Sequence, residues 1–160
     1  MKREILLLGD LRLYETSKPI LKSELDGLPA IVQDLHDTLM DFRSKHHAGR
    51  AIAAPQIGIA KRLIYMHIDK PTVFINPTLE FPDDELMTVM DDCMSFPGLL
   101  VKVQRHRRCR IHYLDMDWKQ CTLSLEGDLS ELLQHEYDHL DGILATMRAM
   151  DNRSYFMKSI

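Results

Sequence analysis

Two histidines four residues apart, His135 and His139, are the clearest sign of chemistry in this sequence. In a helix, side chains at positions i and i+4 project from one face about a turn apart, so both imidazoles can reach one metal ion. Glu136 follows the first histidine and is placed to hold a water molecule at that ion without being a ligand. The alternative is a polar helix face with two histidines by chance, since short motifs do occur by accident. We favour the metal site.

A catalytic metal site of this type needs a third protein ligand and an open position for water. No His or Glu follows His139, so the third ligand must come from upstream, which excludes the common metalloprotease arrangements. The upstream candidates are three cysteines and six histidines, and the spacing of those histidines offers no second pair. Cys109 and Cys121 lie in strand-like runs, where a buried structural thiol is the favoured interpretation. Cys93 instead follows two carboxylates and precedes an irregular segment suited to presenting a ligand.

Helical patterns at both ends flank a β-rich middle of the chain. Apolar residues recur at helical spacing from residue 23 to about 46, and again between Gly127 and Gly142, where a C-cap is expected. Between residues 51 and 125 the apolar runs are short and broken by Pro and Gly. The strand-like runs are residues 62–68, 72–75 and 109–114. The predicted turns are Asn76-Pro77 and Pro97-Gly98. This order of elements predicts an α+β fold with a mostly antiparallel sheet.

The composition is that of an ordinary globular protein. With 160 residues, no internal repeat and no linker, the chain is expected to form one domain over residues 1–160. A formal net charge of -4 argues against a nucleic-acid partner, and the basic run 105–110 is interpreted as a solvated strand face. No apolar run suits a membrane span or a signal peptide. Three cysteines without disulfide spacing fit a reducing compartment, so we expect a cytoplasmic protein.

Three segments resemble the peptide deformylases, in that family's order. Residues 49–58 (GRAIAAPQIG) are similar to its glycine-rich loop, which ends in Ala-Ala-Pro-Gln. Residues 91–95 (DDCMS) are similar to Glu-Gly-Cys-Leu-Ser, and residues 134–142 (QHEYDHLDG) to Gln-His-Glu-x-Asp-His-Leu-x-Gly. Residues 5–10 also look like a deformylase N-terminus. The resemblance spans nearly the whole chain and implies that family's fold, with mostly antiparallel sheets around a central metal-binding helix.

The resemblance implies a role for each matching residue. The metal ligands would be Cys93, His135 and His139. The ion in that family is usually ferrous iron, with zinc, nickel or cobalt as replacements. Glu136 would take a proton from water at the metal and pass it to the leaving amine. Gln56 and the backbone N–H of Met94 would donate hydrogen bonds to the formyl oxygen as it gains charge. The implied reaction removes the N-formyl group from the formyl-methionine of nascent peptides and releases formate.

The departures from the family lie around the substrate rather than the metal. Arg50 stands where the family usually has a small apolar residue lining the methionine pocket. Ala51 replaces the second glycine of the loop, and Asp91 and Asp92 replace Glu and Gly before the cysteine. The residues expected to contact substrate are Arg50, Ala51, Ile52 and Asp92. Arg50 either extends into solvent or pairs with Asp92, or it recognises an anionic group, because a guanidinium suits a carboxylate better than a thioether.

Three functions remain open at this point, and an active deformylase is the leading one. The second is an amidase of the same fold that acts on another N-formyl or N-acyl substrate, such as a small compound. The third is a metal-stabilised, non-catalytic domain that binds a peptide. Glu136 and Gln56 count against the third, since structural metal sites are usually closed by four protein ligands. Some deformylases dock on the ribosome through a long basic C-terminal helix, and the short segment after Gly142 does not predict one.

Overall fold

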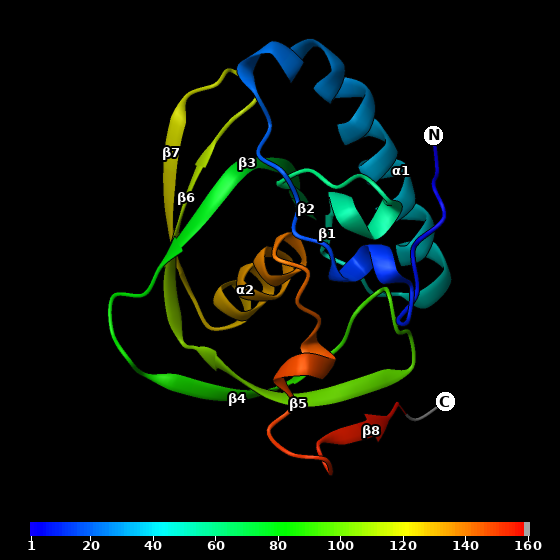
Figure 1. The fold of residues 1–160 in the computed structure, drawn as a ribbon. Coiled ribbons are helices and arrows are strands. Elements are labelled where there is room, and N and C mark those ends of the chain that lie inside the picture. Colours follow the sequence, from blue (N-terminus) through cyan, green and yellow to red (C-terminus); the bar gives the residue numbers. More distant parts are fainter. Residues whose placement is uncertain (159–160) are drawn as a thin grey trace.

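The computed structural model describes residues 1–158 and has an α+β fold (Figure 1). Its helices and strands, in chain order, are α1 (Leu28–His46), β1 (Ala51–Ala53), β2 (Leu63–Ile68), β3 (Lys70–Glu80), β4 (Leu86–Asp91), β5 (Leu99–His106), β6 (Arg108–Leu114), β7 (Gln120–Glu126), α2 (Asp128–Leu140) and β8 (Tyr155–Met157). Short 3-10 helices lie at Leu11–Tyr14, Lys22–Gly27, Ala54–Ile57 and Ala145–Arg148. Across residues 1–158, none of the helices is both long enough and apolar enough to span a bilayer.

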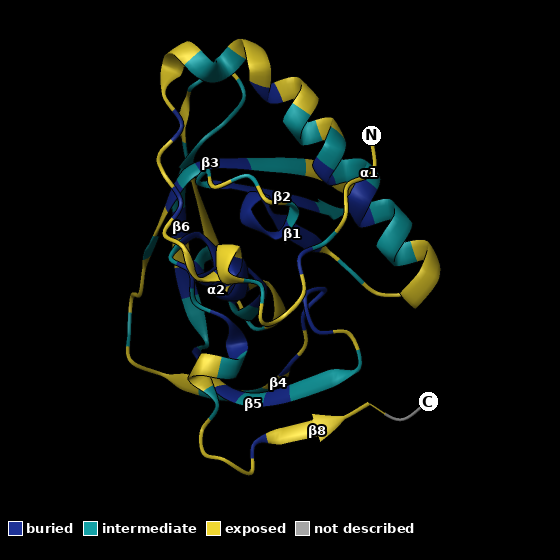
Figure 2. Cartoon of the chain, turned by 45° about the vertical axis from the view of Figure 1, so that its right-hand side comes forward, coloured by how far each residue is buried: buried dark blue, intermediate teal, exposed yellow. Residues whose placement is uncertain are grey.

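Two antiparallel sheets surround α2. One sheet has the strand order β1-β2-β3-β6-β7 and the other has the order β4-β5-β8. Figure 1 shows α2 between them, and α2 contacts strands of both sheets. The helix α1 packs on β1 and β2, which Figure 2 shows as buried strands. The expected arrangement of antiparallel sheets around a central helix is therefore confirmed.

The central helix is held by an apolar face and by a close contact at its C-terminal end. Leu132, Leu133 and Leu140 of α2 pack in a core cluster with side chains of the larger sheet, including Phe74. After the helix, Gly142 has φ 71°, and a Cβ built there would overlap the backbone carbonyl of Tyr14. Only glycine fits both conditions, so the 3-10 helix Leu11–Tyr14 can pack directly against the end of α2.

Two boundaries differ from the sequence-based expectation. The first long helix was predicted from residue 23, but residues 22–27 form a 3-10 helix and α1 begins at Leu28. The predicted turn at Asn76-Pro77 is wrong, because β3 continues through it with a register shift between Ile75 and Thr78. The shift is stabilised by Asn76, whose side chain exchanges two hydrogen bonds of 2.8 Å with the backbone of Ile20. The turn at Pro97-Gly98, before β5, is confirmed.

Candidate metal centre and active site

Cys93, His135 and His139 meet in the interior of the molecule. Their ligand atoms all lie within 4.8 Å of one another. Cys93 Sγ is 3.4 Å from His139 Nε2, which is 3.3 Å from His135 Nε2. A tetrahedral ion with ligand bonds of about 2.0–2.3 Å separates its ligands by roughly 3.3–3.6 Å. The spacing of the three donors therefore fits one metal ion, and a thiolate with two imidazoles suits iron or zinc.

The local structure explains how these ligands come together. Both histidines project from α2, while Cys93 comes from the irregular segment that follows β4. Ser95 N and Gln56 Nε2 both donate to Cys93 Sγ at 3.5 Å. These two donors hold the sulfur beside the histidines, with His139 Nε2 at 3.4 Å.

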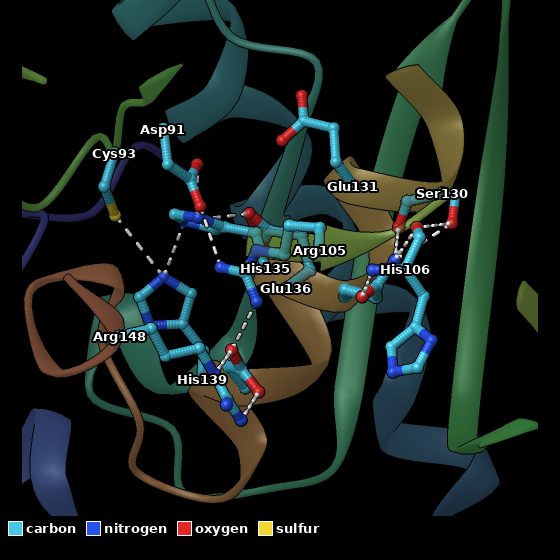
Figure 3. A network of polar contacts seen from close by, with 12 residues as sticks. Asp91, Cys93, Arg105, His106, Ser130, Glu131, His135, Glu136, His139 and Arg148 are labelled. Atoms are coloured by element: carbon cyan, nitrogen blue, oxygen red, sulfur yellow. Dashed lines mark hydrogen bonds and ion pairs between the residues drawn. The ribbon is translucent and has the colours of Figure 1, made fainter. Parts of the chain in front are cut away.

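A buried ion network orients His135 (Figure 3). His135 Nδ1 donates to Asp91 Oδ1 at 2.9 Å, which leaves Nε2 to face the other ligands. Arg105 donates to Asp91 and to Asp138, each at 2.7 Å, and Arg148 donates twice to Asp138. Burial opposes ionisation of Asp91, but His135 and Arg105 lower its pKa to about 2. Asp91 therefore remains a carboxylate next to the metal ligand.

Glu136 lies against the ligand set, with its side chain buried. It is 4% exposed, and its Oε1 is 3.9 Å from His135 Nε2. Within residues 1–158, its Oε2 has no hydrogen-bond partner. Burial is the main cause that raises the pKa of Glu136, to about 7, and Arg50 is close enough to oppose this rise. A carboxyl group with a pKa near 7 can both take and give a proton at neutral pH.

Gln56 and Met94 also lie at this centre. Gln56 is buried, and its Oε1 accepts a hydrogen bond from Ala53 N at 3.0 Å. This bond turns the amide nitrogen of Gln56 toward Cys93 and Ser95, with Ser95 Oγ at 3.1 Å. Met94 is buried and lines the same cavity as Cys93. The residues expected to stabilise the formyl oxygen are therefore next to the metal ligands.

A cavity of about 620 Å³ opens beside the ligands and is lined by Cys93, His135 and Glu136. Of the residues predicted to contact substrate, Arg50, Ala51 and Asp92 line this cavity. Ile52 does not line it. Its side chain is 0% exposed and belongs to the core cluster of α1 and β2, because successive side chains of β1 point to opposite faces.

Of the alternatives that the sequence left open for Arg50, the ion pair with Asp92 is wrong. Arg50 Nη2 contacts Glu131 Oε1 at 3.3 Å, and Asp92 pairs with Lys158 at 2.8 Å. Glu131 and Lys158 line the cavity and were missed from the sequence. Glu131 could have been predicted from the sequence, because it precedes His135 by four residues and therefore lies on the same helix face. Lys158 could not have been predicted, since it is brought to the cavity by the pairing of β8 with β5.

Comparison with known proteins agrees with this geometry. A family model described as polypeptide deformylase matches residues 2–154. A curated relative, peptide deformylase 2 of Ralstonia nicotianae, is 35% identical over 162 residues, which cover 94% of this chain and 89% of that protein. The actinonin complex of a peptide deformylase from Synechococcus elongatus has a TM-score of 0.85 at 30% identity, covering 94% of this chain and 80% of that one. A Met-Ala-Ser-bound peptide deformylase from Acinetobacter baumannii has a TM-score of 0.84 at 26% identity, covering 92% and 98%.

Proposed function

The chain belongs to the polypeptide deformylase family, and from this premise we propose that it removes the formyl group from the N-terminal formyl-methionine of peptides. Deformylase activity makes it a metal-dependent hydrolase of a linear amide. The observation that carries the proposal is the meeting of Cys93, His135 and His139 beside the buried Glu136, in a cavity that opens next to them. Because newly made peptides are the substrates, we propose the cytoplasm as its place of action.

Cys93, His135 and His139 would hold one divalent ion, and we propose ferrous iron as the native one. Zinc, nickel or cobalt would be replacements, since the same ligands suit them. When bound, such an ion lowers the pKa of a water molecule and polarises the formyl carbonyl. Asp91 keeps His135 in the tautomer that presents Nε2 to the ion.

Glu136 moves the proton in this proposal. Its carboxylate accepts the proton that the attacking water loses, and the resulting acid delivers that proton to the departing amine. A pKa of about 7 suits both transfers. Gln56 Nε2 lies 3.5 Å from Cys93 Sγ, so it can donate to the formyl oxygen as that atom gains negative charge. The backbone N–H of Met94 is the second proposed donor.

The test is formate release from formyl-Met-Ala-Ser by anaerobically purified protein, with the metal content measured in parallel. We expect Cys93→Ala to lose both the bound ion and the activity, because a tetrahedral site with two remaining protein ligands binds metal weakly. Cys121→Ser is the matched control and should keep both, since its sulfur hydrogen-bonds to Asp115 and to the backbone carbonyl of Lys119 rather than to a metal ligand. Retention of stoichiometric metal by Cys93→Ala would overturn the assignment.

A further inference from the structure

Arg50 and Glu131 form a charged wall of the cavity beside the metal ligands. Arg50 immediately precedes β1, and Glu131 lies on α2 one turn before His135. Their single contact joins Nη2 to Oε1 at 3.3 Å, with the Arg50 side chain 42% exposed and the Glu131 side chain 18% exposed. In Figure 3, Glu131 lies apart from the hydrogen-bonded network that holds His135.

This charged wall is close to the reacting groups. Both side chains line the cavity that contains His135 and Glu136. The charge of Arg50 acts on Glu136, and the charges of Asp91 and His135 act on Glu131. In an N-formyl substrate the first side chain begins three bonds from the formyl carbon. With that carbon at the metal centre, the side chain begins inside this same cavity, which Arg50 and Glu131 line.

The charged wall has unused hydrogen-bonding capacity. Within residues 1–158, the 3.3 Å contact is the one hydrogen bond made by either side chain. Most guanidinium N–H groups of Arg50 and one carboxylate oxygen of Glu131 therefore remain for a ligand. A ligand carboxylate would be attracted by Arg50 but repelled by Glu131, and an ammonium group would meet the reverse. A neutral carboxamide can accept from Arg50 and donate to Glu131 at once.

We propose that Arg50 and Glu131 select the first side chain of the N-formyl substrate, and that this pocket takes glutamine at least as well as methionine. The inference rests on the proposed function and specifies its substrate class. Glutamine and methionine side chains have nearly the same length. Leu132, which also lines the cavity, offers an apolar surface to the methylene groups of either one. The thioether of methionine, placed against the charged wall, displaces water from Arg50 and Glu131. It cannot replace the hydrogen bonds that this water made to the two charged groups. A carboxamide replaces them.

The experiment compares formyl-Gln-Ala-Ser with formyl-Met-Ala-Ser on the metal-loaded enzyme. The wild type should show a Gln-to-Met ratio of kcat/KM of one or more. The double variant Arg50→Leu/Glu131→Leu, which leaves no unpaired charge, should lower that ratio at least about tenfold. The control is Glu80→Leu/Arg110→Leu, an exposed Arg–Glu pair at 3.1 Å on the larger sheet, and it should leave the ratio unchanged. Calorimetric binding of the products Gln-Ala-Ser and Met-Ala-Ser should follow the same order.

The outcomes separate the two proposals. A wild type with a Gln-to-Met ratio below one, or a ratio that the double variant does not move, overturns the inference and leaves deformylation standing. No formate from either peptide overturns the proposed function and the inference with it. If the double variant does not fold, Glu131→Gln keeps the side-chain size and removes the charged acceptor. It should lower the ratio about threefold, and an unchanged ratio there also overturns the inference.

Discussion

Glu136 differs from the other buried acids of this site in how its charge is compensated. Asp91 and Asp138 share Arg105, and each has a second partner, His135 for Asp91 and Arg148 for Asp138. Glu136 is equally buried, yet its Oε2 has no partner among the described residues, and burial raises its pKa to about 7. A carboxyl group left unpaired in this way is costly to the fold, so a role in proton transfer explains its position better than a structural one.

At the residue scale, we expect Glu136→Gln to lower kcat by roughly a hundredfold or more while the metal content stays at the wild-type level. The amide fills the same volume but cannot shuttle a proton. The assay is formate release at neutral pH, with metal analysis of the same preparation. Glu126→Gln, an exposed residue at the end of β7, is the control and should match the wild type. Activity of Glu136→Gln within tenfold of the wild type would contradict the assigned role.

At the scale of elements, the site depends on how α2 is held between the sheets. The strands β4 and β5 contribute Asp91 and Arg105, which fix His135 from the side of the smaller sheet. The 3-10 helix Leu11–Tyr14 fixes the C-terminal end of α2 through the contact at Gly142. Each attachment predicts a measurable change in stability.

Gly142→Ala should lower the free energy of unfolding by about 3 kcal/mol or more. An alanine there adopts a left-handed backbone, which costs roughly 1–2 kcal/mol, and its Cβ overlaps the carbonyl of Tyr14. Gly58→Ala is the matched control, since Gly58 is left-handed (φ 82°, ψ 13°) and an added Cβ would make only an ordinary contact of 3.6 Å with the flexible side chain of Arg12. It should cost only the backbone part. Urea denaturation of the three proteins measures both values, and equal losses would refute the contact.

Asp91 should make the stability of the metal-free protein depend on pH. The groups that face it are Arg105 from β5 and His135, Glu131 and Glu136 from α2. The pKa of Asp91 is about 2 in the folded protein, below its ordinary value of 3.8, so the unfolded chain binds the proton first as the pH falls. The ionised Asp91 therefore adds about 2 kcal/mol to the free energy of unfolding above about pH 4, and this stabilisation is lost as the pH falls toward 2.

Urea denaturation of the wild type and of Asp91→Asn at several pH values between 5 and 2 tests this dependence. The advantage of the wild type should shrink across that range, because the asparagine does not titrate. A difference between the two proteins that stays constant with pH would show that Asp91 is not the group responsible.

At the scale of the whole molecule, the metal should stabilise the fold, because the ligands come from segments that meet only in the folded state. A metal present at a hundredfold excess over its Kd adds about 2.7 kcal/mol to the free energy of unfolding. For a domain of this size that corresponds to a rise in Tm of roughly 5–10 °C. Scanning calorimetry of metal-free protein titrated with Zn²⁺ or anaerobic Fe²⁺ measures it. Cys93→Ala should show almost no rise, and an equal rise in that variant would place the bound ion elsewhere.

The sequence by itself determined the metal-binding helix, the acid beside it and the α+β class. The spacing of His135, Glu136 and His139 is local, and a helix converts it directly into a shared face. Its own segment made Cys93 only one of several upstream candidates for the third ligand. The ordered match of three motifs to the deformylase family then selected it. The same resemblance pointed to Arg50 as the place where this chain departs from the family.

Only the tertiary structure decided what surrounds those residues. It paired Arg50 with Glu131 rather than Asp92, and it moved Ile52 from the expected substrate surface into the core. It also joined Asp138 to Arg105 and Arg148. The physical reason is that an ion pair or a buried position depends on distances of a few ångströms between segments that are far apart in the chain. Local spacing sets which residues share a helix face or a strand edge, whereas packing of the sheets around α2 sets which of them touch.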